Sequence, residues 1–158
     1  MRGNDQVIEQ LNAALKEELT AIVQYMVHAE MCQNWGYKRL GDYIKKQAID
    51  EMRHAEGLIE RILFLEGAPK VDVMMGPRIG QSVKEQIEID LEGEVRAVGQ
   101  YNAAVKICAN AGDDATRALF EKMTKDEEEH TDFLETQLSI IKDIGIEKYL
   151  SMKMHPES

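Results

Sequence analysis

Residues that interrupt helices or favour strands are scarce in this sequence. Three of its 158 residues are proline, and aromatic residues make up 6% of the chain. Because proline breaks helices and aromatic side chains favour strands, this composition disfavours a β-sandwich and favours helix over most of the chain. An apolar share of 44% is enough for a buried core, so we expect residues 1–158 to form one globular, all-α domain.

Cysteine is scarce as well. Cys32 and Cys108 are far apart in the chain, and neither lies in a Cys-x-x-Cys motif or in a cluster of cysteines and histidines. Two isolated cysteines give no indication of a disulfide framework or of a zinc knuckle. We therefore expect both to be buried free thiols.

Long apolar runs and an excess of basic residues are both missing. No stretch of 18 or more uncharged apolar residues occurs, and the N-terminus leads into an amphipathic pattern without the apolar segment of a signal peptide. The 19 basic and 29 acidic residues give a net charge of −10, which repels nucleic acid and anionic membranes and attracts cations. We expect a cytoplasmic protein that binds neither nucleic acid nor membrane, although a solvated acidic surface alone would also explain this charge.

Apolar residues recur with a helical period along four long segments. The first two segments predict a helical hairpin over about residues 5–65, and the other two predict a second hairpin over about 82–142. Residues 66–81 contain three glycines and two prolines, which suits a crossover that runs the length of a bundle. A last short helix is expected over about 146–152. The prediction is a four-helix bundle with a long crossover and a short fifth helix.

Polar side chains are predicted to begin two of the helices. Asn4 and Asp5 are both good N-caps for the first helix, and Ser82 with Glu85 has the spacing of a capping box for the third. The turn Trp35-Gly36-Tyr37 is too short for anything but an antiparallel pair of helices in the first hairpin.

The two predicted hairpins are related by an internal repeat. At an offset of 76 residues, EELTAIVQY (17–25) aligns with GEVRAVGQY (93–101), and DEMRHAEGL (50–58) aligns with DEEEHTDFL (126–134). One ungapped offset over both pairs of segments indicates two related hairpins packed about a pseudo-two-fold axis. Chance similarity between amphipathic helices is the alternative, and the rarity of histidine, with four in the chain, argues against it.

Six ionisable residues that the repeat relates fall within the apolar stripes of these helices. They are Glu18, Glu51, His54, Glu94, Glu127 and His130. Burying an unpaired carboxylate is costly, and four carboxylates together repel one another, so apolar packing does not explain these positions. We expect a cation to lie among them.

The Glu-x-x-His spacing in two of the helices points to a metal. Residues three apart lie on one face of a helix, so each pair can offer a carboxylate oxygen and an imidazole nitrogen to one iron or manganese ion. Two such pairs, with one further glutamate from each of the other two helices, are typical of di-iron and di-manganese carboxylate proteins. The alternative is that these residues form ordinary salt bridges on helix surfaces.

These residues have distinctive neighbours. They occur in Glu51-Met52-Arg53-His54 and Glu127-Glu128-Glu129-His130, and they are accompanied by Tyr25, RILFLEGAP (61–69) and IGIEKYL (144–150). In these stretches the sequence resembles the bacterioferritin family, and the resemblance spans residues 1–155. It implies a ferritin-like bundle, a hollow shell of twenty-four subunits built from two-fold dimers, a ferroxidase centre in each subunit, and haem b between paired subunits.

The resemblance also assigns roles. The six residues would hold two iron ions, with Glu18 and Glu94 as terminal ligands, Glu51 and Glu127 as bridges, and His54 and His130 as imidazole ligands. The implied enzyme is a ferroxidase that oxidises ferrous iron with oxygen or peroxide. Ferric mineral would be stored in the shell and released with the help of haem, with electrons from a small ferredoxin.

Met52 lies on a different face of its helix from Glu51, because successive residues are about 100° apart. Apolar residues that include Ile49 and Leu63 lie near that face, so the first hairpin is predicted to be apolar on two sides and to form a self-complementary dimer interface. From spacing alone, Met52 is expected to pack in this interface. The resemblance implies instead that Met52 and its symmetry mate ligate one haem iron.

Tyr25 is expected to lie close to Glu18. It is a candidate redox-active residue that supplies an electron for oxygen reduction, and a core tyrosine hydrogen-bonded to a metal ligand is the alternative. His28 and His155 have no partner at ligand spacing, so we give them no functional role.

The chain also departs from the family. The inner-surface iron site of the family often pairs a histidine with an aspartate, but the matching residues are Lys46 and Asp50, which weakens the case for that site. Asn34, Glu66 and Asp132 match polar positions of a pore between subunits, although exposed acidic residues are ordinarily solvated surface.

Two other functions could use the same residues. A di-iron oxygenase or peroxidase would need the six ligands but no shell, and the apolar outer face with Met52 argues against it. A haem electron-transfer protein would leave the dinuclear site vestigial, and the complete set of six ligands argues against that.

Overall fold

The computed structural model describes residues 1–72 and 75–155. The four long helices are α1 (Asp5–Trp35), α2 (Lys38–Phe64), α3 (Val83–Asn110) and α4 (Asp114–Ile144), and α5 (Ile146–Ser151) is a single short helix. No strand occurs in these two ranges. The predicted all-α bundle with a short fifth helix is confirmed. None of the helices in the described part of the chain is long and apolar enough to cross a membrane.

The helix ends follow the capping residues. The Asn4 side chain accepts hydrogen bonds from two N–H groups in the first turn of α1, and Ser82 accepts one from the Glu85 N–H at 3.2 Å. The predicted capping box is incomplete, because the Glu85 carboxylate accepts from the backbone N–H of Gln81 at 3.4 Å instead of that of Ser82. Gly36 ends α1 with a φ of 94°, a left-handed conformation that favours glycine.

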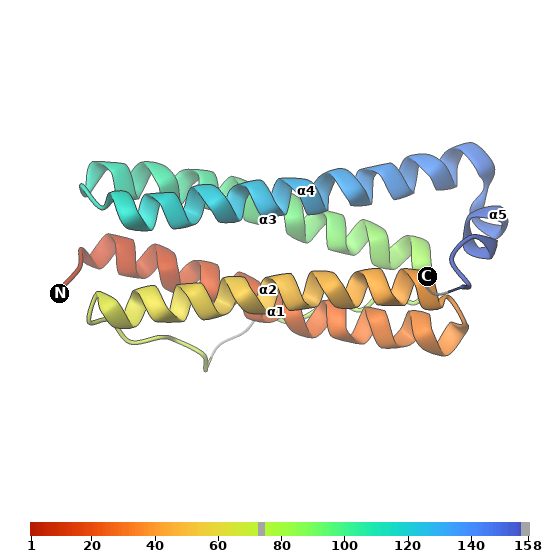
Figure 1. Ribbon diagram of the computed structural model, residues 1–158, viewed down its shortest axis with the longest axis horizontal. Coiled ribbons are helices and arrows are strands. Elements are labelled where there is room, and N and C mark those ends of the chain that lie inside the picture. Colours follow the sequence, from red (N-terminus) through yellow and green to blue (C-terminus); the bar gives the residue numbers. More distant parts are fainter. Residues whose placement is uncertain (73–74, 156–158) are drawn as a thin grey trace.

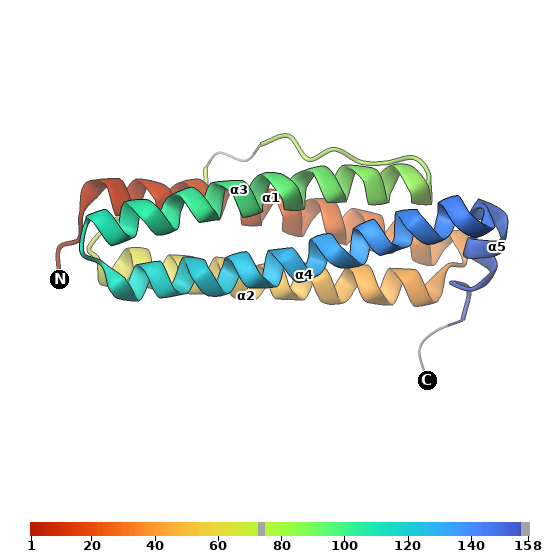
Figure 2. The same cartoon turned by 90° about the horizontal axis from the view of Figure 1, so that it is seen from above.

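The bundle consists of two antiparallel hairpins placed side by side (Figure 1). Helix α1 packs along α2, helix α3 packs along α4, and α1 also contacts α3. The described parts of the crossover from α2 to α3, residues 66–72 and 75–81, lie along the outside of the bundle, and the second part runs beside α3 (Figure 2). Helix α5 lies at the end of the bundle opposite the N-terminus, where the buried Tyr149 hydroxyl donates to the Gln137 side chain at 2.7 Å.

Buried polar side chains of α1 hold the crossover in place. Asn12 donates to the backbone oxygen of Ala68 at 3.1 Å and accepts from the Lys70 N–H at 2.8 Å. His28 Nε2 accepts from the Gly80 N–H at 3.0 Å, so the proton of the neutral ring lies on Nδ1, which is 3.0 Å from a carboxylate oxygen of Asp90. His28, for which the sequence offers no partner, thus ties the crossover to α3.

The apolar core is divided into two clusters. One includes Leu11, Leu58 and Phe120, and the other includes Ile44 and Leu134, nearer to α5. Each cluster contains one of the two cysteines, both fully buried and free, as the sequence predicts. The positions of the six ionisable residues in the helices lie between the two clusters.

Candidate metal centre

All four long helices contribute to one buried polar cluster near the middle of the bundle. Helices α1 and α3 each supply one glutamate, and helices α2 and α4 each supply a glutamate and a histidine three residues apart. No more than 6% of any of these residues is exposed; they are Glu18, Glu51, His54, Glu94, Glu127 and His130. The structure therefore brings together every residue that the sequence predicts as a metal ligand.

The cluster forms two groups of four residues that could each hold a metal ion. Within each group, one nitrogen or oxygen atom from every residue lies within 4.8 Å of the others. The first group is Glu18, Glu51, His54 and Glu127, and the second is Glu51, Glu94, Glu127 and His130. Because Glu51 and Glu127 belong to both groups, one carboxylate from α2 and one from α4 can bridge two ions.

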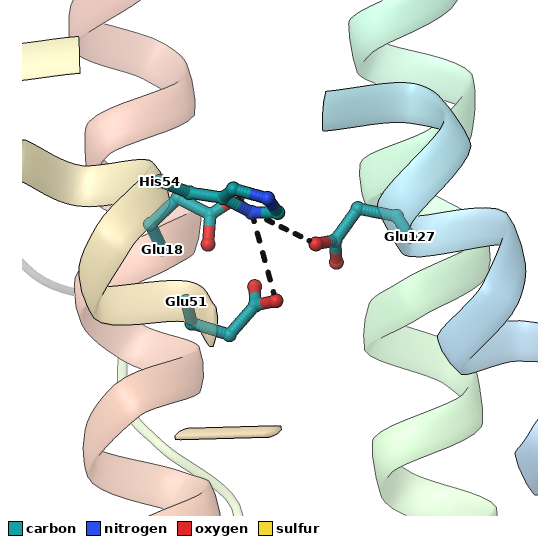
Figure 3. Close-up of side chains that lie close together, drawn as sticks. All are labelled: Glu18, Glu51, His54 and Glu127. Carbon is teal, nitrogen blue, oxygen red and sulfur yellow. Dashed lines mark ion pairs between the residues drawn. The ribbon is translucent and has the colours of Figure 1, made fainter. Parts of the chain in front are cut away.

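The first group shows how the side chains converge (Figure 3). His54 of α2 lies between the carboxylates, with its Nδ1 atom 3.1 Å from Glu127 Oε1 and 3.7 Å from Glu51 Oε1. Glu18 Oε1 of α1 is 3.5 Å from the same nitrogen. The second group has the corresponding arrangement, with His130 Nδ1 3.3 Å from Glu51 Oε1 and 3.4 Å from Glu94 Oε1.

Each of the six residues has one buried polar atom that makes no hydrogen bond with the described part of the chain. These atoms are Glu18 Oε2, Glu51 Oε1, His54 Nδ1, Glu94 Oε2, Glu127 Oε1 and His130 Nδ1. Leaving a buried polar group unsatisfied costs about 1–3 kcal/mol. Six such atoms at one place, four of them carboxylate oxygens and two imidazole nitrogens, fit a site that binds iron or manganese.

Two aspartates orient the imidazole rings. Asp126 Oδ2 lies 2.8 Å from His54 Nε2, and Asp50 Oδ2 lies 3.2 Å from His130 Nε2. A carboxylate at Nε2 holds the proton there and leaves Nδ1 free to bind a metal. Spacing along one helix does not indicate this role for the aspartates, although the repeat aligns Asp50 with Asp126.

Two tyrosines donate hydrogen bonds to the glutamates of α1 and α3. The Tyr101 hydroxyl donates to Glu18 Oε1 at 2.5 Å, and the Tyr25 hydroxyl donates to Glu94 Oε1. Tyr25 thus lies beside the cluster, and its hydrogen-bond partner is Glu94 of the facing helix. Helices α1 and α3 are antiparallel, so a residue two turns beyond Glu18 comes to lie opposite Glu94. Tyr101 was missed, although the repeat aligns it with Tyr25.

Burial and crowding shift the proton affinities of the cluster. Burial and the negative charge of Glu18 raise the pKa of Glu51 well above its usual value, and burial with the close contact to Glu94 does the same for Glu127. Burial alone would lower the histidine pKa values, but the close contacts with the surrounding carboxylates outweigh it. They raise the pKa of His54 to about 11 and that of His130 to about 9. Without metal, protons therefore balance much of the negative charge.

The remaining predicted residues lie outside this cluster. Met52 is on the surface of α2 and is 46% exposed, and other apolar residues of α1 and α2 are exposed as well: Met26, Val27, Ile49, Leu63 and Phe64. Asp50 contacts His130, and Lys46 lines the same surface pocket as these two residues. The proposed pore residues Asn34, Glu66 and Asp132 are exposed, as is His155.

The sequence matches a known family model and several known proteins. Residues 8–144 match the family model of the ferritin-like domain. The chain is 44% identical over 156 residues to a bacterioferritin from Brucella melitensis, covering 99% of this chain and 97% of that one. It is 42% identical to a bacterioferritin from Rhodobacter capsulatus, with the same coverage. It is also 42% identical to one from Mycolicibacterium paratuberculosis, over 94% of each chain.

Proposed function

The chain belongs to the bacterioferritin family, and on that premise we propose that it stores iron and oxidises ferrous iron at a di-iron ferroxidase centre. The observation that carries the proposal is the set of six buried, unsatisfied ligand atoms, divided into two groups that share two carboxylates. A dinuclear site with this donor set suits two ferrous ions as substrate, because carboxylate oxygen and imidazole nitrogen both bind iron.

In the proposed reaction, each of two ferrous ions gives up one electron to oxygen or peroxide. The bridging carboxylates of Glu51 and Glu127 hold the two ions close together, and the four carboxylates stabilise the higher charge of the ferric product. Asp126 and Asp50 keep the histidine rings in the tautomer that binds metal. Tyr25 is held against the site by its hydrogen bond to Glu94, which suits it to supply a further electron.

Haem b is proposed to bind on the outer face of α2 through Met52. The fit rests on the exposed thioether of Met52 and on the exposed apolar residues of α1 and α2, since a thioether is a soft ligand and a porphyrin needs apolar surroundings. When bound, haem would carry electrons inward for iron release, and a small ferredoxin is the proposed donor. Met52 of two subunits would face each other across the dimer axis.

The haem proposal predicts that haem binding and ferrous oxidation depend on different residues of α2. We expect Met52→Leu to lose haem and to keep ferrous oxidation, because Met52 is exposed on α2 whereas its neighbour Glu51 is buried in the centre. Met152→Leu is the matched control, since Met152 is an exposed methionine that follows α5, outside the apolar face of α1 and α2, and it should leave haem content unchanged. Haem per subunit can be measured by its absorbance after purification. Full haem content in Met52→Leu would refute this ligand.

Storage further requires a hollow shell, which we propose is a homo-24-mer built from two-fold dimers. At 18.0 kDa per chain the particle would have a mass of about 430 kDa, which sedimentation velocity can measure. We expect that mass, and we expect metal-free protein at low ionic strength to dissociate through dimers, because like charges repel more strongly there. A protein that never exceeds a dimer would favour a di-iron enzyme without a cavity.

Ferrous oxidation itself is tested by mixing anaerobic, metal-free protein with increasing ferrous iron and then with oxygen or peroxide. We expect a rapid phase whose amplitude saturates at about two iron ions per chain, as the two groups of ligands require. A rapid phase that saturates at one ion per chain would contradict the dinuclear site.

A further inference from the structure

The wall of the centre between α1 and α3 encloses a small cavity. Its volume is about 20 Å³, enough for one molecule of the size of water. Its lining includes residues of the centre: Glu51, Glu94, Glu127, Tyr25 and Tyr101. It also includes residues that are not metal ligands, among them Glu17, Thr20, Gly93 and Arg96. A small molecule at this position would therefore face the bridging carboxylates directly.

The internal repeat places this cavity on the pseudo-two-fold axis. At the offset of 76 residues, Glu17 corresponds to Gly93 and Thr20 corresponds to Arg96, and all four line the cavity. The same axis relates the two groups of metal ligands to each other. A molecule that enters here therefore approaches both metal positions in an equivalent way, as a reagent that takes one electron from each ion must do.

An ion pair covers one half of the cavity. Arg96 Nε donates to Glu17 Oε1 at 3.0 Å, and the second guanidinium nitrogen, Nη2, donates to Glu17 Oε2 at 3.3 Å. The Arg96 side chain is 52% exposed and that of Glu17 is 10% exposed, so the pair lies between solvent and the cavity. The other half has small residues at the corresponding positions, Gly93 and Thr20. The ion pair therefore makes its half of the outer lining bulkier than the other half.

Resting on the proposed function, we propose that this gap admits the oxidant, a small neutral molecule such as dioxygen or hydrogen peroxide, and that the Arg96–Glu17 pair determines its selectivity. Space for one water-sized molecule suits such an oxidant, whereas a hydrated metal ion would have to lose its water shell. With hydrogen peroxide, two ferrous ions supply two electrons, the O–O bond breaks, two protons are taken up and two water molecules form. With dioxygen, the same two electrons and two protons give hydrogen peroxide.

The test uses two variants with opposite expected effects. Arg96→Gln removes the ion pair, and Gly93→Val adds a side chain at the cavity wall. A Cβ atom at Gly93 would have Arg96 Nη2 as its nearest neighbour, at 4.0 Å, so the position leaves room for a β-carbon. Each protein is loaded anaerobically with two ferrous ions per chain and mixed with excess hydrogen peroxide or dioxygen. We expect the second-order rate constant to rise about threefold or more in Arg96→Gln and to fall by a similar factor in Gly93→Val.

A bulky oxidant tests selectivity. The ratio of the rate constants for hydrogen peroxide and tert-butyl hydroperoxide should fall in Arg96→Gln, because the larger molecule gains more from the wider gap. The matched control is Arg78→Gln, which removes an exposed ion pair to Glu92 of α3 at 2.5 Å, and it should leave both rate constants unchanged.

Co²⁺ binding to the metal-free proteins, measured by absorbance, shows whether a variant changes access of the metal ion or only access of the oxidant. We expect the same Co²⁺ binding rate in wild type and in Arg96→Gln. Faster Co²⁺ binding with unchanged peroxide kinetics would overturn the proposal, and so would unchanged peroxide kinetics in both variants. A wild-type protein that reacts no faster than free ferrous iron would overturn the proposed function as well, so the two failures are distinguishable.

Discussion

His130→Ala should abolish rapid ferrous oxidation while the bundle remains folded. His130 supplies the only nitrogen atom of the second ligand group, so its loss leaves three carboxylates to hold that ion. Loss of a partner of a metal ligand typically costs 10–100-fold, and we expect loss of the ligand itself to cost about 100-fold or more in rate. The stoichiometry of tight metal binding should fall from two ions to one. Stopped-flow absorbance and metal titration measure the two effects.

Two variants control this experiment. His155→Ala removes an exposed histidine outside the cluster and should oxidise iron at the wild-type rate. Glu94→Ala removes another ligand of the same group and should resemble His130→Ala. Helix content should be unchanged in all three variants, because the bundle is held together by two apolar clusters that contain none of the three substituted residues. Rapid oxidation in both ligand variants would show that the reaction occurs elsewhere.

The bundle was predictable because its determinants are local. Helical periodicity, a proline-poor composition and caps such as Asn4 and Ser82 act within a few residues of the chain, and the structure has its helices where they indicate. The crossover was recognisable from its glycines and prolines. Its attachment was not, because Asn12 and His28 bond to backbone groups more than fifty residues away.

The convergence of the six candidate ligands was predictable for a similar reason. Two Glu-x-x-His pairs place their side chains on one face of a helix whatever the rest of the chain does. The partners of these ligands depend on how helices face each other, which spacing along one helix does not reveal. Asp126 reaches His54 from α4, and Tyr101 reaches Glu18 from α3, so each contact needs the antiparallel register of two helices.

The ion pair between Arg96 and Glu17 could not be predicted from the sequence. Both residues look like ordinary helix-surface charges, and they lie 79 positions apart on different helices. Their position at one side of the cavity depends on how α1 and α3 face each other. The repeat aligns Arg96 with a threonine and Glu17 with a glycine, so the two halves of the chain have kept the ligands and diverged at the wall.

The crowding that makes the centre suitable for metal also makes the metal-free protein sensitive to pH. Four of its groups hold protons more tightly in the folded state than they do ordinarily: Glu51, His54, Glu127 and His130. The folded protein therefore binds more protons than the unfolded chain at neutral and moderately alkaline pH. Wherever that is true, the free energy of unfolding decreases as the pH rises.

Between pH 7 and pH 9 we expect the metal-free protein to lose stability steeply. An unfolded histidine is largely neutral above its ordinary pKa of about 6.5, whereas folded His54 and His130 keep their protons up to pKa values of about 11 and about 9. For each proton that the folded state retains and the unfolded chain has lost, the free energy of unfolding falls by about 1.4 kcal/mol for every unit by which the pH rises.

Urea unfolding of the metal-free protein at several pH values measures this slope. His54→Gln should reduce it by removing one of the retained protons, and His155→Gln, in the exposed C-terminal segment, should leave it unchanged. Bound Co²⁺ should weaken or reverse the trend, because the metal replaces protons on the ligands and binds more tightly as the pH rises. A metal-free protein whose stability is constant or increases from pH 7 to pH 9 would show that the centre does not hold these protons, and that its carboxylates are balanced in another way.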